Sequence, residues 1–365
     1  MINRLLEPKL LKGKEQSIVQ TLPWAGFGGP PPKTAPDKKG KLPDTHVQIV
    51  DQKALDARLK LETREREGLV KSLKSLGEPK ELVLATVEHF DALRDLEQAL
   101  PHHAALFVPL RNRVKIQAAT QQPLQLGRML LGGEPGIGKS YAVHAIAEAL
   151  KLPLLEIQLA GNSDTLLFTG TAKQWGNSAP GVLTRFMASC SVANPLVVLE
   201  EIDKTGANSH GSVQDVLLML LEPENSKNFD DRFLNLPIDL SYLSYLATAN
   251  DLEQLSPPLL SRLAVVELEA PGAEHLAQLA QRLFDLLTQR LGLSALFEKE
   301  LPAGLVGELI ADKPGLRLIR QRLESGIAAA VETFETPATL ASARKLVPVL
   351  KVAPIKSERP PMRFV

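Results

Sequence analysis

Short apolar runs alternate with amphipathic stretches through the middle of the chain, after Pro123. Runs with strand character occupy residues 127–133, 152–160, 195–203, 242–250 and 264–270. Between them, stretches such as 141–151 and 213–222 place apolar residues three or four positions apart, as a helix requires. Continuously apolar strands separated by helices are typical of a parallel sheet that is covered on both faces. The pattern therefore predicts an α/β fold with a central parallel sheet.

After Gly272 the pattern is helical throughout. Apolar residues recur at helix spacing in 273–292, 302–312 and 315–334. We therefore expect residues 272–340 to form a small all-helical domain. The remaining residues, 341–365, are broken by prolines and are expected to be a tail.

The beginning of the chain has a different composition. Residues 21–45 are rich in Pro, Gly and Lys, so residues 1–45 are predicted to be a flexible, proline-rich arm. Trp24 and Phe27 lie within this arm. Two interpretations stay open: the arm is a mobile tail, or the two rings pin it to a neighbouring subunit.

Residues 46–104 show helical patterns and are expected to form a helical segment ahead of the α/β domain, which we place at residues 105–271. A first helical stretch ends at Gly77, a residue suited to a helix C-terminus. A second begins with Pro79, which suits a first helical turn.

Composition limits the classes of partner. The 42 basic residues balance 42 acidic ones, so no overall charge attracts nucleic acid or an anionic membrane. Cys190 is the single cysteine, which fits a reducing compartment. The chain begins without a leader-like apolar block, and no run approaches the ~20 apolar residues that cross a bilayer. These features predict a cytoplasmic protein, and they favour neither a membrane nor nucleic acid as its partner.

The chemistry is concentrated in the stretch "GEPGIGKS", residues 133–140, which fits the pattern G-x-x-x-x-G-K-[ST] between a strand and a helix. Its glycines let backbone N–H groups converge on a phosphate, and the following helix directs its positive end there. Lys139 is expected to reach the β and γ phosphates of ATP, and Ser140 to bind Mg²⁺. The residues expected to bind the nucleotide are Gly133, Glu134, Pro135, Gly136, Ile137, Gly138, Lys139, Ser140 and Tyr141.

Two acids follow the apolar run "LVVL", where a ligand of an open α/β sheet binds. Glu200 is expected to hold Mg²⁺ through its water shell, and Glu201 to activate the attacking water. Asn250 ends another apolar strand, in a place where its amide can meet water or the γ-phosphate. By contrast, His102 and His103 are expected to be a surface-loop pair rather than a metal site, because adjacent side chains do not share a helix face.

Several motifs together resemble an AAA+ ATPase, and more narrowly the ATPase module of the protease Lon. They are the phosphate loop, "NPLVVLEEIDK", "LLEPENSKNFDDRFLNLPIDLS", "LATANDLEQLSPPLLSRLAVVEL", "GTAKQWGNSAPG" and the "GLR" of the helical part. The resemblance covers roughly residues 105–335. It implies a P-loop α/β domain followed by a helical lid, with a hairpin formed by "NFDDRFLNLPIDL" before Asn250.

The resemblance also implies roles for single residues. Glu201 matches the catalytic glutamate, and Asn250 matches the polar sensor-1 residue. Arg262 matches the arginine finger that enters a neighbouring subunit's site, and Arg317 the sensor-2 arginine that brings the lid to the γ-phosphate. Trp175 falls where related rings carry the aromatic residue of a substrate-gripping pore loop.

This resemblance makes the expected function ATP hydrolysis in a homo-oligomeric ring, expected to be a hexamer, that remodels a protein partner. Because the chain ends soon after the lid, we expect it not to cut peptides by itself. The family usually has Asp-Glu where this chain has Glu200-Glu201, and an extra methylene displaces the metal-side carboxylate by ~1.5 Å. An assembly switch that binds ATP and hardly hydrolyses it is therefore the alternative. A DNA-associated loader is disfavoured by the neutral charge.

Overall fold

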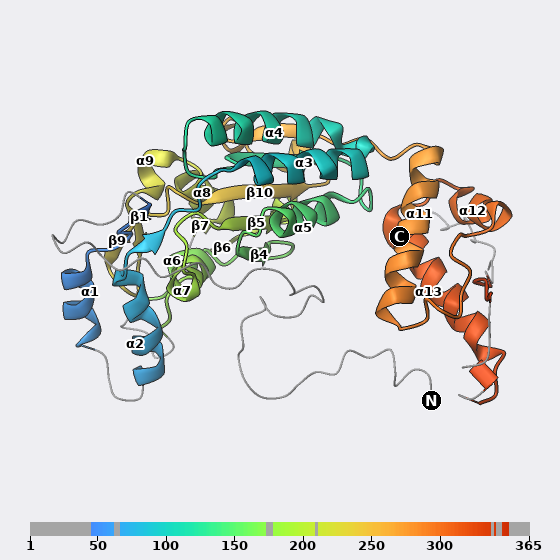
Figure 1. The fold of residues 1–365 in the computed structure, drawn as a ribbon. Helices are drawn as coiled ribbons and strands as arrows, with labels where there is room; N and C mark the ends of the chain where they lie inside the picture. Colours follow the sequence, from blue (N-terminus) through green and yellow to red (C-terminus); the bar gives the residue numbers. More distant parts are fainter. Residues whose placement is uncertain are drawn as a thin grey trace, which may run out of the picture. The chain divides into compact units, whose positions relative to one another are not determined.

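A computed structural model describes residues 45–61, 66–172, 178–208, 211–336, 339–340 and 345–349. The described residues all belong to one compact unit, Thr45–Val365 (Figure 1). The predicted arm and most of the predicted tail lie outside the described residues, so these two expectations stay predictions.

A five-stranded sheet forms the centre of this unit, with the strand order β11-β3-β10-β5-β4. Its strands are β3 (Arg128–Gly132), β4 (Leu154–Gln158), β5 (Leu196–Glu200), β10 (Ser244–Ala249) and β11 (Ala264–Glu267). Every neighbouring pair is parallel. The predicted α/β fold with a central parallel sheet is confirmed, and all five strands lie within the apolar runs identified from the sequence.

The sheet separates two apolar cores. Successive residues of one strand point to opposite faces, so Val197 belongs to one core and Val198 to the other. In β5 and β10 every residue is buried, because helices cover both faces. The mainly apolar composition of these two strands thus follows from their position inside the sheet.

Helices before and between the strands supply these cores (Figure 1). They are α1 (Gln52–Leu59), α2 (Glu67–Lys74), α3 (Val87–Ala99), α4 (Ala104–Ala119), α5 (Lys139–Ala149), α6 (Leu166–Thr169), α7 (Val182–Ser189), α8 (Val213–Leu220) and α10 (Pro257–Leu260). A further short helix, α9 (Pro223–Ser226), contributes no residue to either core. Short 3-10 turns are η4 (Ser75–Gly77), η5 (Pro101–His103), η6 (Ile202–Lys204) and η7 (Leu252–Gln254). Leu55 and Leu73 join the first core and Leu93 the second, so residues 46–104 pack onto the sheet instead of forming a core of their own.

The expected helix start at Pro79 is wrong. Lys80–Glu81 form a short strand, β2, which pairs with β1 (His46–Val47), and the helix begins only at Val87. Thr86 caps it: its hydroxyl accepts from the His89 backbone, and its own N–H donates to His89 Nδ1 at 3.2 Å. This reciprocal cap stabilises a later start than the proline indicated.

The hairpin expected before Asn250 is present as β8 (Phe229–Asp231) and β9 (Leu236–Ile238), paired antiparallel. Two shorter strands, β6 (Ala207–Asn208) and β7 (Gly211–Ser212), also pair antiparallel. No helix in the described part of the chain is long and apolar enough to cross a membrane.

Three helices follow the sheet, as the sequence predicted: α11 (Ala273–Arg290), α12 (Ala303–Ile310) and α13 (Leu316–Glu332). They enclose a third apolar core, in which Phe284 and Phe297 meet edge to face with ring centres 5.9 Å apart. The boundaries proposed for this helical domain, like those of the other domains, stay predictions.

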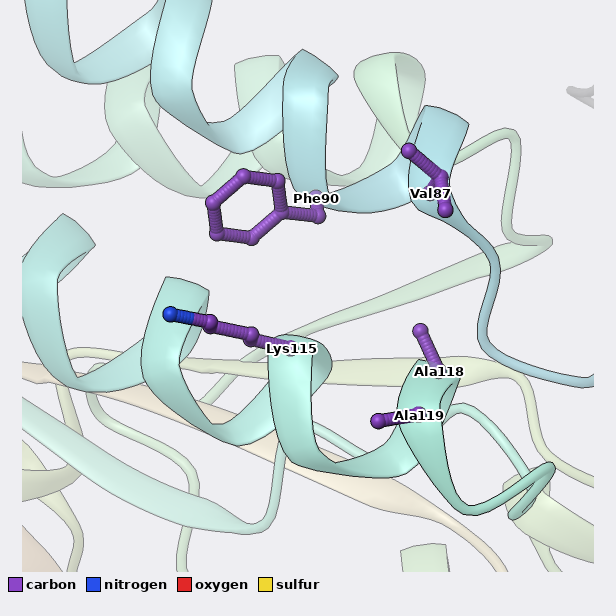
Figure 2. Close-up of a pocket in the computed structure, with 5 residues that line it drawn as sticks. All are labelled: Val87, Phe90, Lys115, Ala118 and Ala119. Atoms are coloured by element: carbon purple, nitrogen blue, oxygen red, sulfur yellow. The ribbon is translucent and has the colours of Figure 1, made fainter.

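A hollow of about 250 Å³ lies between α3 and α4 (Figure 2). It is lined by Val87, Phe90, Lys115, Ala118 and Ala119. Apart from the Lys115 ammonium these side chains are apolar, and none of them belongs to the predicted phosphate loop. The hollow is therefore not part of the candidate site described below.

Asp231 connects the hairpin to the helix that follows residue 181. Its side chain is fully buried, and its two oxygens accept from Gly181 N (2.8 Å), Thr184 Oγ1 (2.6 Å), Phe233 N (2.9 Å) and Leu234 N (3.0 Å). Burial raises the pKa of this carboxyl, and the four hydrogen bonds oppose that shift. A buried carboxylate is tolerated here because each of its two oxygens accepts two hydrogen bonds.

We expect Asp231→Ala to lower the free energy of unfolding by on the order of 3 kcal/mol, because it leaves buried donors without an acceptor. Asp230→Ala, which changes an exposed neighbour on the same strand, is the matched control and should have little effect. Denaturant unfolding followed by circular dichroism measures both. Equal stability of the two variants would contradict the role given to Asp231.

Candidate nucleotide-binding site

The loop between β3 and α5 has a backbone that favours glycine. Gly133 has a φ of 142° and Gly138 a φ of 102°, both in the left-handed region. A Cβ atom on Gly133 would lie 2.5 Å from the Leu268 carbonyl oxygen, so a side chain there would displace the backbone. Gly138 directly precedes α5, which places the helix N-terminus at the loop. The loop thus has the form that the sequence pattern predicted.

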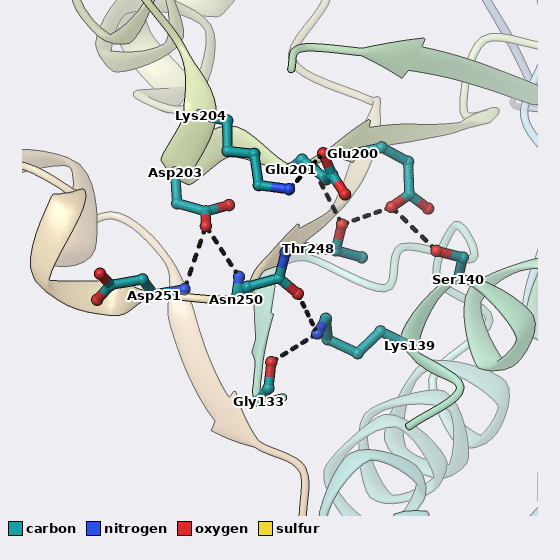
Figure 3. A network of polar contacts seen from close by, with 10 residues as sticks. All are labelled: Gly133, Lys139, Ser140, Glu200, Glu201, Asp203, Lys204, Thr248, Asn250 and Asp251. Carbon is teal, nitrogen blue, oxygen red and sulfur yellow. Dashed lines mark hydrogen bonds and ion pairs between the residues drawn. The ribbon is translucent and has the colours of Figure 1, made fainter. Parts of the chain in front are cut away.

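Lys139 lies inside the curve of this loop (Figure 3). Its Nζ donates to Gly133 O at 2.6 Å, to Glu134 O at 3.0 Å and to Asn250 Oδ1 at 2.8 Å. The residue is 8% exposed, and burial lowers its pKa while nearby acids, Asp203 first among them, oppose the shift. The structure thus brings together Lys139 and Asn250, which are far apart in the sequence.

Glu200, the last residue of β5, is buried next to the loop (Figure 3). Its Oε2 accepts from Ser140 Oγ at 3.0 Å and from Thr248 Oγ1 at 2.5 Å. Its Oε1 is also buried, and it has no hydrogen-bond partner among the described residues. A buried carboxylate oxygen without a donor, beside a serine hydroxyl, fits a hard divalent cation such as Mg²⁺.

Glu201 occupies a different environment from Glu200. Its backbone is left-handed (φ 57°, ψ 51°), and its N–H donates to Thr248 Oγ1 at 3.0 Å. Its carboxylate is 35% exposed and forms an ion pair with Lys204 at 2.9 Å. Since one acid is buried against the loop and the other reaches solvent, the adjacent glutamates can serve different chemical functions.

Asp203 fixes the turn that carries Asn250. Its Oδ2 accepts from the backbone N–H groups of Asn250 and Asp251, each at 3.1 Å (Figure 3). The end of β5 is thereby joined to the end of β10. Neither Asp203 nor Thr248 was among the site residues predicted from the sequence. A hydroxyl within the apolar run "YLATA" was the available signal for Thr248, because a buried hydroxyl needs a partner.

Arg262 and Arg317, the two arginines predicted to act at the site, lie in different parts of the chain. Arg262 follows α10; its Nε pairs with Glu222 Oε2 at 3.1 Å, and its Nη1 donates to Pro258 O at 2.9 Å. These contacts are within its own chain and do not include the phosphate loop. Arg317 is exposed, and in the described part of the chain its guanidinium has no hydrogen-bond or ion-pair partner.

The start of α13, which carries Arg317, nevertheless contacts the loop. The residue before it, Leu316, donates its N–H to Gly136 O at 2.8 Å, where α13 begins. A Cβ atom on Gly136 would lie 3.4 Å from the Gly315 Cα, so the two backbones approach closely. The start of α13 is thus docked on the phosphate loop.

Two further residues named from the sequence remain. Tyr141 is 47% exposed, and Trp175 lies outside the described residues.

A cavity of about 320 Å³ adjoins the loop. Glu134, Pro135 and Ile137 line one side of it. The other side is formed by residues 270–273 and 276, and by Lys313, Pro314 and Gly315 before α13. The cavity offers space for the part of a nucleotide that extends beyond its phosphates.

The expectation that His102 and His103 form a surface pair is wrong for His103, which is fully buried. Its Nε2 donates to Ile137 O at 3.2 Å, so the ring packs against the back of the phosphate loop. Burial and the neighbouring His102 lower the pKa of His103 to about 4. Within the described ranges no group of three or more His, Cys, Asp or Glu side chains is arranged to hold a metal ion.

Comparison with known proteins agrees with this geometry. Residues 129–269 match the family model described as "ATPase family associated with various cellular activities (AAA)". Over these residues the chain is similar to an AAA ATPase domain. The match covers the phosphate loop, both acids at the end of β5, Asn250 and Arg262.

The chain is also similar to part of the Lon proteases. The chain is 34% identical over 221 residues to "Lon protease homolog 2, peroxisomal" of Oryza sativa subsp. indica. The aligned region makes up 60% of this chain and 25% of that protein. It is 39% identical over 140 residues to "Lon protease 4" of Sorangium cellulosum, where the aligned region makes up 38% of this chain and 18% of that protein. It is 30% identical over 198 residues to "Lon protease" of Fusobacterium nucleatum, where the aligned region makes up 53% of this chain and 26% of that protein. The chain therefore spans about a quarter or less of these relatives, and the predicted resemblance to their ATPase region is confirmed.

The burial of His103 predicts that stability depends on pH. Its pKa is about 4 in the fold, against ~6.5 for an unfolded chain, so folding favours the neutral ring. This contribution is complete above pH ~6.5 and is lost as the pH falls toward 4, by about 3 kcal/mol at most. We expect His103→Gln to flatten the dependence of the unfolding free energy on pH between 6.5 and 4.

Denaturant titrations at closely spaced pH values test this expectation. His102, whose pKa is also lowered to about 4 by burial and by His275, contributes in the same direction. An unchanged slope in His103→Gln would show that His103 does not favour the neutral form.

Proposed function

We propose that this chain binds ATP with Mg²⁺ and hydrolyses it, as one subunit of a ring that acts on a protein partner. The buried Glu200 carboxylate carries the proposal. One of its oxygens is bonded to Ser140, and the other lacks a donor among the described residues beside a phosphate loop. Lys139 supplies a positive charge at the same place. A triphosphate with a divalent cation is the ligand whose charges these groups match.

In this proposal Ser140 and Glu200 would hold Mg²⁺, which neutralises charge on the phosphate oxygens when it is bound. Glu201 accepts a proton from water as the water oxygen attacks the γ-phosphorus. The bond between the γ-phosphorus and the bridging oxygen breaks, and ADP and phosphate leave. Lys139 stabilises the phosphate charge, and Asn250 orients the water.

Arg317 and Arg262 complete the proposed site from two directions. The α13 N-terminus contacts Gly136, so a turn of the Arg317 side chain could bring its charge to the γ-phosphate of the same chain. Arg262 is bonded to Glu222 and to Pro258 of its own chain, and it would serve the site of a second copy. A head-to-tail arrangement of this kind closes into a ring, for which six copies is the expected number.

The partner class comes from the relatives, whose names describe proteases. We infer from them that the substrate of this chain is a protein and that Trp175 contacts it in the ring. Cytoplasmic location is part of the same proposal. These elements rest on the similarity and on the sequence, and the experiments below address the ATPase cycle on which they depend.

A second candidate is an assembly switch that binds ATP but hydrolyses it slowly or not at all. Two observations favour it. Glu201 is engaged by Lys204 at 2.9 Å, which competes with its action on water. Glu200 also stands where the resemblance to AAA+ ATPases leads us to expect aspartate, and the longer side chain changes the position of the metal-side carboxylate. The two candidates differ in turnover, which can be measured directly.

We expect Glu201→Gln to lower the rate of phosphate release about 100-fold or more, because the amide cannot accept a proton. Binding of a fluorescent ATP analogue should stay within about twofold of wild type, since the phosphate contacts are retained. Glu148→Gln, exposed on α5, is the control and should keep the wild-type rate. Equal, near-zero release by wild type and Glu201→Gln would establish the switch in place of the enzyme.

We expect Arg262→Ala to bind ATP normally but to lose about 10³-fold in turnover, because the charge of a neighbour is missing at the transition state. Mixing it with Glu201→Gln should restore part of the activity. In a mixed ring, a site with an intact Glu201 can receive an intact Arg262 from the other variant. Normal hydrolysis by Arg262→Ala, or a mixture without recovery, would refute the assignment in trans.

A further inference from the structure

Thr248 lies between the two acids of the candidate site. It is the fifth residue of β10 and is 1% exposed. Its hydroxyl donates to Glu200 Oε2 at 2.5 Å and accepts from the Glu201 backbone N–H at 3.0 Å (Figure 3). A single side chain on one strand therefore contacts two successive residues at the end of the neighbouring strand.

The hydrogen bond to Glu200 gives its carboxylate a direction. Ser140 Oγ and Thr248 Oγ1 both donate to Oε2, which is thereby fully occupied. Oε1 receives no hydrogen bond from any described residue. The β-branched threonine has a stiff χ1 angle, so its hydroxyl stays in place. The hydroxyl thus determines which carboxylate oxygen is left for a cation.

The second hydrogen bond acts on the backbone. Glu201 has left-handed dihedral angles, which are unfavourable for a residue with a side chain. Its N–H has turned out of the sheet ladder, and the Thr248 hydroxyl is its acceptor. The strand therefore ends at a defined point, with Glu200 directed toward the loop and Glu201 toward Lys204.

We propose that Thr248 is a positioning residue for the Mg²⁺ ligand, and that it is needed because this ligand is glutamate rather than aspartate. Glutamate has one more rotatable bond than aspartate, so its carboxylate needs an additional anchor. Anchoring Oε2 on Thr248 places Oε1 for the cation in spite of the longer side chain. The inference rests on the proposed function, since it concerns the same Mg²⁺–ATP site.

Mg²⁺ titrations of the binding of a fluorescent ATP analogue test this role without measuring hydrolysis. Thr248→Val keeps the shape of the side chain and removes its hydroxyl, and it should weaken the apparent Mg²⁺ affinity about 10-fold or more. Binding of the analogue in EDTA should stay unchanged. Thr248→Ser keeps the hydroxyl and should remain within about threefold of wild type.

Ser244→Ala is the matched control. Ser244 is a buried hydroxyl at the opposite end of β10, where its Oγ accepts from Leu126 N at 2.9 Å. Its loss should lower the melting temperature without changing the Mg²⁺ affinity. If Thr248→Val does not fold, Thr248→Ala allows the same comparison with a smaller side chain.

A double-mutant cycle with Glu200→Asp tests why Thr248 is needed. Aspartate is shorter by ~1.5 Å, so it cannot keep the hydrogen bond to Thr248 in its present position. Removing the hydroxyl in the Glu200→Asp background should therefore cost less than about threefold in Mg²⁺ affinity, against 10-fold or more with Glu200. Equal losses in both backgrounds would overturn the inference.

The remaining outcomes separate the inference from the proposed function. If wild type binds the analogue in a Mg²⁺-dependent manner and Thr248→Val does so equally well, the inference fails and the proposed function stands. If wild type does not bind the analogue with or without Mg²⁺, both fail. A loss of affinity in Thr248→Ser as large as in Thr248→Val would also overturn the inference, because it would not depend on the hydroxyl.

Discussion

A carboxylate buried at the end of a parallel strand is the feature on which the candidate site depends. Glu200 has little access to water, and a buried negative charge is costly unless nearby charges and donors compensate it. Ser140 and Thr248 satisfy one oxygen, and the Lys139 ammonium lies in the same region. The other oxygen has no donor in the described part of the chain. This uneven compensation is the observation on which the proposed Mg²⁺–ATP site rests.

The strand order explains why these groups meet. β3 lies between β11 and β10, and β10 lies next to β5, so three carboxyl ends are adjacent at one edge. The loop after β3 supplies Lys139, the end of β5 supplies the acids, and the turn after β10 supplies Asn250. Asp203 then bonds the backbone of that turn, which limits its movement relative to β5. The site is thus held by rigid sheet hydrogen bonds instead of by flexible loops alone.

Contacts beyond the sheet couple the site to other parts of the chain. His103 supports the phosphate loop from behind, and Leu316 contacts it from the start of α13. A change in the conformation of the loop would therefore alter its contacts with His103, directly before α4, and with the start of α13. Arg262, by contrast, is held by Glu222 within the chain. A role in a neighbouring site requires that this pair open, and an ion pair that is partly open to solvent is weak enough to allow it.

Local patterns in the sequence were sufficient for the main architecture. Apolar runs predicted five strands, and their order along the chain with the intervening helices predicted a parallel sheet. The glycines of residues 133–138 and the lysine after them predicted the phosphate loop, because the required backbone angles and charge are properties of a short segment. The acids after "LVVL" were placed correctly at the sheet edge for the same reason.

Other features were decided by contacts between distant segments. His103 is buried because the phosphate loop packs on it, which its own neighbours in the sequence do not indicate. The start of α3 depends on a cap formed by Thr86 and His89, while Pro79 alone indicated an earlier start. Thr248 gains its importance from two residues on an adjacent strand, 47 and 48 positions away. Sequence periodicity determines which residues face a core, but only tertiary packing determines which buried hydroxyl meets which carboxylate.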